Sequence, residues 1–168
     1  KKDVRVLENI KTNEKWMETT LHEIGHAVYF ANINEDLPFV LRDSAHILVT
    51  ESIAMLFGRL SKNIDFIKRY GEVPMGSLES FLQILKNKLR LRQLIFARWA
   101  MVMMNFEKSL YSNPDQDLNN LWWELVKKYQ LLNFSRDKPD WASKIHLVSS
   151  PVYYHNYLFG ELLASQID

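Results

Sequence analysis

The sequence predicts an all-α fold, and three observations support this prediction. Gly and Pro number only five each among the 168 residues. They fall at breaks between segments in which apolar residues recur at helical spacing. No run of alternating polar and apolar residues lies between turn signals, as a half-buried strand would require. We therefore expect one helical domain, residues 1–168, which is ordinary for this length.

The predicted helices follow one another along the chain. Thr12 or Asn13 can cap the first helix, which should end near Asn32. Further helices are expected over residues 45–60, 64–70, 78–110, 118–131 and 152–167. Ser77 or a neighbour can cap the helix over 78–110, which would be about 50 Å long at 1.5 Å per residue. Its middle, residues 89–106, is apolar on most sides, which is typical of a helix buried in a large body.

Composition and charge exclude several classes of protein. Lys and Arg number 21 and Asp and Glu 20, so the net charge of +1 gives no argument for binding nucleic acid or an anionic membrane. No stretch reaches the roughly 18 apolar residues of a membrane-spanning helix. Cysteine is absent, so a metal would have to be held by His, Asp or Glu. With no signal segment in this chain either, we expect a soluble protein and favour the cytoplasm, although the compartment is not decided.

The first predicted helix contains the motif His22-Glu23-Ile24-Gly25-His26, or H-E-x-x-H. Residues i and i+4 lie one above the other on a helix, so His22 and His26 can bind one zinc ion. Glu23 lies about 100° round the helix and can reach a water molecule on the metal. Zinc lowers the pKa of that water, and the Glu23 carboxylate can take its proton as the water attacks a carbonyl. The motif therefore predicts one zinc ion per chain.

Two histidines leave zinc short of a protein ligand, and Glu51 is the candidate. It lies 25 residues after His26 in the second predicted helix, among apolar neighbours. A buried carboxylate is costly without a partner, and zinc would be a good one. The site would then lie between the H-E-x-x-H helix and the helix that follows. Asp43 and Glu35 are competing carboxylates in the predicted loop, and Glu51 could instead be a capping or exposed residue.

Several motifs together resemble the angiotensin-converting-enzyme-like zinc dipeptidases. In that family H-E-x-G-H-x-x-Y-F is followed by Leu-Pro, an Arg and, nine residues later, the glutamate ligand. This chain has Leu21 to Phe30, then Leu37-Pro38, Arg42 and Glu51. Further matches are Trp122-Trp123 with Lys128-Tyr129-Gln130, Lys144-Ile145-His146, Ser149-Ser150-Pro151 and Tyr154-His155-Asn156-Tyr157. The last of these also resembles the thimet oligopeptidase and oligoendopeptidase group.

The resemblance implies roles for individual residues. His22, His26 and Glu51 would be zinc ligands, and Glu23 would be the general base. His146 would donate a hydrogen bond to the substrate backbone or to the oxyanion, and Tyr157 would stabilise the oxyanion. The resemblance further implies that Lys144 and Tyr154 bind the C-terminal carboxylate of a peptide.

The chain departs from the family pattern at three places. Tyr154 follows His146 by eight residues instead of seven, so we favour a one-residue insertion that keeps Tyr154 and Tyr157 in register over the ungapped alternative, Tyr153. Asn156 replaces a chloride-binding arginine, so activation by chloride is not expected. Met55 replaces an aspartate that orients a zinc-binding histidine, so either another residue takes that role or the site is weaker.

Other notable residues have ordinary interpretations. On pattern alone His146 is a core histidine, and only the resemblance favours a functional role. His46 and His155 are expected to be structural or exposed. The basic stretch Lys86 to Arg92 should be solvated, and Trp99 with its neighbouring methionines should be core packing.

The favoured function is a zinc-dependent metallopeptidase that hydrolyses short peptides, of the peptidyl-dipeptidase or oligopeptidase type. The alternative is a non-catalytic zinc-binding helical fragment, or a degenerate peptidase that acts as a binding module. Members of the resembled family have two helical lobes in a much longer chain. We therefore expect this chain to be the C-terminal catalytic portion of a longer peptidase. Alone, it should be a poor enzyme, and it should expose an apolar surface that pairs with an N-terminal lobe or with a second copy.

Overall fold

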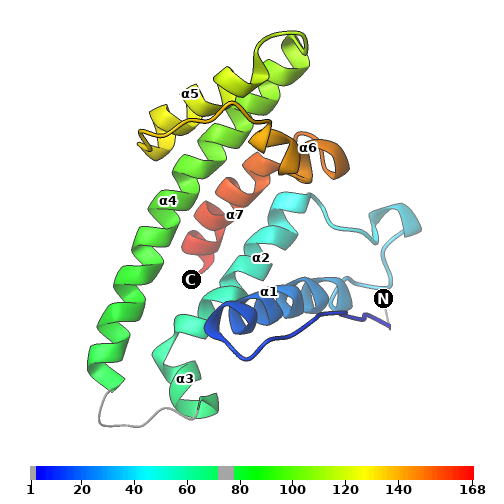
Figure 1. The fold of residues 1–168 in the computed structure, drawn as a ribbon. Helices are drawn as coiled ribbons and strands as arrows, with labels where there is room; N and C mark the ends of the chain where they lie inside the picture. Colours follow the sequence, from blue (N-terminus) through cyan, green and yellow to red (C-terminus); the bar gives the residue numbers. More distant parts are fainter. Residues whose placement is uncertain (1–2, 72–77) are drawn as a thin grey trace. The chain divides into compact units, whose positions relative to one another are not determined.

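The structure, a computed structural model, describes residues 3–71 and 78–168, and every regular element in these ranges is a helix (Figure 1). The α-helices are α1 (Glu14–Ala31), α2 (Ile47–Arg59), α3 (Ile64–Tyr70), α4 (Leu78–Ser112), α5 (Leu118–Gln130), α6 (His146–Ser149) and α7 (Tyr154–Ile167). Short 3-10 helices are η1 (Phe39–Leu41), η2 (Leu60–Lys62) and η4 (Asp140–Ser143). The all-α prediction is confirmed. Among the described residues, no helix is long and apolar enough to cross a membrane.

The predicted helices are found with small shifts at their ends. Asn13 caps α1, and its side chain accepts a hydrogen bond from the Trp16 N–H at 3.0 Å. His46 caps α2 in the same way, through a bond from the Leu48 N–H, which agrees with the structural role expected of it. The predicted cap at Ser77 lies outside the described residues. The four-residue helix α6 was not predicted, because it is too short to show a period.

The middle of α4 is buried on one side only, although its sequence is apolar on most sides. Val102, Met103 and Phe106 are inaccessible to solvent, whereas the side chain of Leu94 is 66% exposed. Leu91 and Ile95 are exposed with it. The basic residues from Lys86 to Arg92 are exposed, as predicted.

The chain divides into two compact units, which are described separately. Unit 1 comprises residues Lys1–Leu89 and Phe159–Asp168, and unit 2 comprises Arg90–Leu158. In unit 1, α2 packs against α1 and also against Gly160 of α7, where an added Cβ atom would lie 3.3 Å from Glu51 Cβ. Arg59 ties the same two helices together through an ion pair of 2.6 Å with Glu161.

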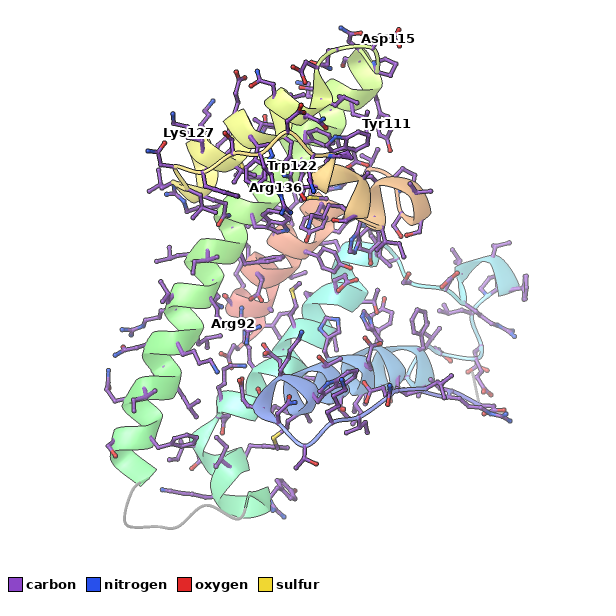
Figure 2. All side chains as sticks on the ribbon, viewed as in Figure 1. Arg92, Tyr111, Asp115, Trp122, Lys127 and Arg136 are labelled. Atoms are coloured by element: carbon purple, nitrogen blue, oxygen red, sulfur yellow. The ribbon has the colours of Figure 1, made fainter. Side chains whose placement is uncertain are left out.

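The core of unit 2 is aromatic and lies between α4, α5 and α6. Its buried residues are Val102, Met103, Phe106, Trp122, Val126 and Leu147. The rings of Phe106 and Trp122 meet edge to face, with centroids 5.1 Å apart, a favoured geometry for aromatic pairs. Figure 2 labels Trp122 among the side chains of this unit. Trp99 packs against the same core, as the sequence predicted.

Candidate metal centre and hydrogen-bonding cluster

The candidate metal centre depends on a close approach of α1 and α2 in unit 1. Gly25 is buried, and a Cβ atom at this position would lie 2.6 Å from Ala54 Cα and 3.0 Å from the Ile53 carbonyl oxygen. Real Cβ atoms do not come that close to backbone atoms. Because residue 25 has no side chain, α2 can lie directly on the face of α1 that carries His22 and His26.

This approach brings together the three residues predicted to bind a metal. Glu51 Oε2 lies 3.5 Å from His22 Nε2 and 3.8 Å from His26 Nε2. One ligand atom from each residue falls within 4.8 Å of the others. Tetrahedral zinc with bonds of about 2.0–2.1 Å holds its ligand atoms roughly 3.3 Å apart. The donor set and its spacing therefore fit a zinc ion, and the three residues could hold a metal.

Thr50 supports this group from α2. Its side-chain oxygen lies 2.8 Å from His26 Nδ1, and the residue is only 1% exposed. A hydrogen bond to the second ring nitrogen fixes the orientation and tautomer of a metal-binding histidine. Met55 is buried, and an added Cβ at Gly160 would lie 3.2 Å from its sulfur. Met55 stands where the family has the aspartate, and the side chain that contacts a predicted metal-binding histidine here is that of Thr50.

Burial keeps both histidines in the neutral form that binds metals. Burial, helped by the positive charge that His26 would carry, lowers the pKa of His22 to about 4, although Glu18 opposes the shift. Burial also lowers the pKa of His26 against the opposing effect of Glu51. The pKa of Glu23 is raised, mainly by burial and further by the negative charge of Glu8. Glu8 Oε2 accepts a hydrogen bond of 2.6 Å from the Thr20 hydroxyl, which holds its carboxylate against α1.

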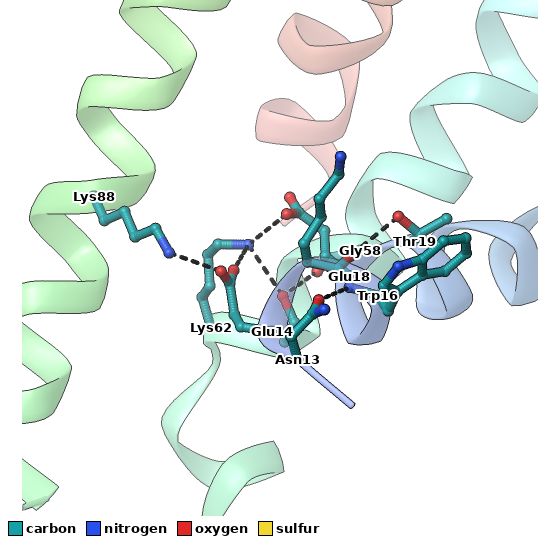
Figure 3. Close-up of polar contacts among 10 residues, drawn as sticks. Asn13, Glu14, Trp16, Glu18, Thr19, Gly58, Lys62 and Lys88 are labelled. Carbon is teal, nitrogen blue, oxygen red and sulfur yellow. Dashed lines mark hydrogen bonds and ion pairs between the residues drawn. The ribbon is translucent and has the colours of Figure 1, made fainter. Parts of the chain in front are cut away.

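A buried lysine anchors the start of α1 to the end of α2 (Figure 3). Lys62 Nζ lies 3.0 Å from Glu14 Oε1 and 3.0 Å from Glu18 Oε2, and its side chain is 2% exposed. Lys88 makes a further ion pair of 2.7 Å with Glu14. The ammonium group of Lys62 is thus compensated by two carboxylates, which is the condition for burying a charge without a large penalty. The network fixes the helix that carries His22.

Unit 2 holds a second cluster, made of one histidine and two tyrosines. The His146 ring lies edge to face with Tyr154 and with Tyr157, at centroid distances of 5.1 and 5.8 Å. The Tyr157 hydroxyl lies 3.4 Å from His146 Nε2. The Tyr153 ring meets the Tyr157 ring edge to face, with centroids 5.1 Å apart. His146 thus contacts both tyrosines of the register with the one-residue insertion.

Trp99 connects this cluster to Lys144. Its Nε1–H donates a hydrogen bond of 2.8 Å to the Tyr154 hydroxyl. The Lys144 ammonium lies over the rings of Trp99 and Trp122, 5.4 and 5.9 Å from their centroids. Such cation–π contacts hold a lysine head group in place without neutralising it. Burial raises the pKa of Tyr154, and the bond from Trp99 partly offsets this.

The predicted site residues therefore form two groups. His22, Glu23, His26 and Glu51 lie in unit 1, and Lys144, His146, Tyr154 and Tyr157 lie in unit 2. Glu35 and Asp43 do not join the candidate metal group among the described residues. Sequence reasoning missed Thr50, Glu8 and Trp99, whose contacts arise from packing between segments. The signal that could have suggested Thr50 is its place next to Glu51.

A helical fold in which an H-E-x-x-H pair meets a glutamate from the next helix is the arrangement of a metallopeptidase. The chain belongs to the angiotensin-converting enzyme family of peptidases, whose sequence profile matches residues 1–168.

Two curated proteins are similar to parts or most of this chain at 25% identity. An inactive angiotensin-converting enzyme-related protein of Caenorhabditis elegans is 25% identical over 114 residues, 65% of this chain and 13% of that protein. Carboxypeptidase 1 of Bacillus subtilis (strain 168) is 25% identical over 189 residues, 98% of this chain and 37% of that protein. The chain thus spans only part of the length of both relatives. No solved structure matches the chain significantly.

Proposed function

We propose that this chain carries the catalytic residues of a zinc-dependent metallopeptidase that hydrolyses short peptides, of the peptidyl-dipeptidase or oligopeptidase type. The observation that carries the proposal is the group of His22, His26 and Glu51, whose ligand atoms lie within 4.8 Å of one another beside Glu23 of the same motif. Membership of a peptidase family supports the same reaction class.

In this proposal His22, His26 and Glu51 hold one zinc ion. When bound, zinc would polarise the scissile carbonyl and make a water molecule easier to deprotonate. Glu23 takes a proton from the attacking water and delivers it to the leaving amine. The raised pKa of Glu23 suits a group that must both accept and release a proton.

His146 and Tyr157 are proposed to donate hydrogen bonds to the substrate and to the carbonyl oxygen as negative charge develops on it. Donors held in advance at such an oxygen stabilise the transition state more than the ground state. The edge-to-face contacts of His146 with Tyr154 and Tyr157 restrict all three rings, which supports this role.

Lys144 and Tyr154 are proposed to bind the C-terminal carboxylate of the peptide. The Lys144 ammonium lies over the rings of Trp99 and Trp122, and Tyr154 already accepts a hydrogen bond from Trp99. Its own hydroxyl proton is therefore available for donation to a carboxylate. This pair favours cleavage near the C-terminus, as a peptidyl-dipeptidase performs it.

A non-catalytic role is the second candidate, and one relative favours it by its name, inactive angiotensin-converting enzyme-related protein. This chain has both histidines, the intervening Glu23 and a glutamate, Glu51, whose Oε2 lies 3.5 Å from His22 Nε2 and 3.8 Å from His26 Nε2. A protein that only bound zinc would not require Glu23. Catalysis is therefore the better-supported candidate.

Substitution of Glu23 by Gln separates the two candidates. Zinc content, measured by mass spectrometry of metals, should stay near one per chain. Hydrolysis of a blocked tripeptide by the full protein should fall by about a hundredfold or more. Glu35→Gln, at an exposed loop carboxylate, is the matched control and should leave both unchanged.

His26→Ala tests the metal assignment independently and should abolish stoichiometric zinc at neutral pH. Tight zinc binding by this variant would refute the ligand set. Zinc binding by the unaltered protein with no hydrolysis of any short peptide would favour the non-catalytic candidate.

A further inference from the structure

Glu107 is a buried acid that the proposed reaction does not use. It lies on α4 in unit 2 and is 7% exposed. Its Oε1 accepts a hydrogen bond of 2.5 Å from the backbone N–H of Val152 and one of 3.2 Å from the Tyr111 hydroxyl. A buried carboxylate without such donors would be strongly destabilising. The Glu107 carboxylate therefore holds the backbone N–H of Val152 in place.

Val152 has an unusual backbone conformation. Its φ angle is +54°, in the left-handed region that β-branched residues rarely adopt. Such a residue persists only where its surroundings hold it in place. The Val152 N–H is held by Glu107, and the residue lies in the turn between α6 and α7.

The helix α6, which precedes this turn, is attached to the same face of α4 through Leu147. The Tyr111 hydroxyl lies 3.2 Å from the carbonyl oxygen of Leu147, and 3.2 Å from Glu107 Oε1. Its single proton is thus shared between two acceptors. Residues 107 and 111 are one helical turn apart, so they present neighbouring groups to the turn. Figure 2 labels Tyr111.

We propose that Glu107 is a positioning residue that sets the geometry of His146 relative to Tyr154 and Tyr157 by holding Val152, together with Tyr111, which holds Leu147 from the same face of α4. Leu147 follows His146, and Val152 precedes Tyr154 by two residues. The functional part of this inference rests on the proposed roles of His146 and Tyr157. The positioning itself can be measured without any activity.

The spacing along the chain explains why such a residue is needed. Tyr154 follows His146 by eight residues, and the left-handed Val152 absorbs part of this length within the turn. Without Glu107, Val152 would relax to a negative φ angle and redirect the start of α7. The contact between the Tyr157 hydroxyl and His146 Nε2 is already long, at 3.4 Å, so a small rotation would separate them.

Nuclear Overhauser effects between the His146 ring and the rings of Tyr154 and Tyr157 report this geometry directly. In the full protein, Glu107→Ala should remove these effects and shift the His146 Hε1 resonance. Glu107→Gln keeps an acceptor oxygen for Val152 and should preserve them. Val152→Gly should be silent alone, because glycine adopts the left-handed region freely. Combined with Glu107→Ala, it should restore the signals.

Steady-state kinetics then test the functional part. Glu107→Ala should lower kcat by about tenfold with KM within twofold, as loss of transition-state positioning does. Adding Val152→Gly should return kcat to within threefold of the unaltered protein, which a general loss of stability would not allow. If no variant hydrolyses peptides, the proposed function fails, while the nuclear Overhauser effects still test the positioning.

Two results would overturn the inference. One is unchanged His146–tyrosine signals in Glu107→Ala, and the other is failure of Val152→Gly to restore them. If Glu107→Ala does not fold, Tyr111→Phe is the test, because Tyr111 is half exposed and loses only its hydroxyl. It should weaken the same signals, and an unchanged spectrum would contradict the attachment of Leu147.

Discussion

The contact between Thr50 and His26 shows how one hydroxyl can define a metal ligand. The Thr50 oxygen occupies Nδ1 of the ring at 2.8 Å, while Nε2 lies 3.8 Å from Glu51. The two nitrogens of His26 therefore have separate tasks, one structural and one toward the candidate metal. Thr50 directly precedes Glu51 in the chain. The helix α2 therefore supplies both the Glu51 carboxylate and the hydroxyl that orients the His26 ring.

Thr50→Val should weaken zinc binding by about tenfold or more, because it removes the hydroxyl and keeps the shape of the side chain. Competition with a chromophoric chelator at neutral pH measures the effect. Thr50→Ser retains the hydroxyl and should bind zinc nearly as tightly as the unaltered protein. Equal affinity of the Val and Ser variants would show that the hydrogen bond does not support the metal centre.

The structure brings predicted residues together where the signal lay in local spacing. His22 and His26 share a helix face by their spacing of four, and Glu51 was identified as a buried carboxylate on the next helix. Thr50 and Glu107 could not be found in this way. The partners of Thr50 and Glu107 lie 24 and 45 residues away in the sequence. Short-range sequence patterns do not predict such contacts.

At the scale of elements, Gly25 controls the distance between α1 and α2. A Cβ atom there would lie 2.6 Å from Ala54 Cα, so the helices would have to separate. Gly25→Ala should therefore lower the free energy of unfolding by about 1–3 kcal/mol. It should also abolish tight zinc binding, because Glu51 would move away from the histidines. Urea unfolding and the chelator titration measure the two effects.

Gly58 provides a matched control on the same pair of helices. A Cβ atom at Gly58 would meet the Glu18 carbonyl oxygen at 3.5 Å and His22 Cβ at 3.7 Å, which are ordinary contacts. Gly58→Ala should bind zinc normally and gain up to about 1 kcal/mol from its higher helix propensity. If both variants behaved alike, the close approach at Gly25 would not be what sets the site.

The long helices were largely predictable from the sequence. The short helix α6 and the side of α4 that is covered were not. Apolar periodicity, the Asn13 cap and the Gly and Pro breaks located the long helices. The helix α6 escaped because four residues contain one turn and its position depends on contacts such as that of Leu147 with Tyr111. Composition alone does not tell which side of an apolar helix is covered, so the sequence could not name Leu91 and Leu94 as exposed positions.

At the scale of the whole molecule, two helices contribute to both compact units. The boundary between the units falls within α4 and within α7, after Leu89 and after Leu158. The sequence predicted one helical domain from the length of the chain, and no linker of Gly, Pro or polar residues marks the positions where the two units divide. A division inside continuous helices leaves no compositional trace, so it emerged only from the packing.

The acid side of the stability profile should reveal the buried histidines of the metal-free protein. The pKa of His22 is about 4 when folded and near 6.5 when free, so the unfolded chain binds the proton first. The free energy of unfolding should therefore fall as the pH decreases from about 6.5 to 4, by up to about 3 kcal/mol. The lowered pKa of His26 acts in the same direction.

Urea unfolding followed by circular dichroism at pH 7.0, 5.5 and 4.5 measures this dependence. His22→Gln removes one of the two contributions, so its stability should change less over the same range. Saturating zinc should steepen the dependence of the unaltered protein, because protons and the metal compete for the same ring nitrogens. A metal-free protein equally stable at pH 7.0 and 4.5 would contradict this. The His22 imidazole would then have to reach solvent freely, whereas its side chain on α1 is only 24% exposed.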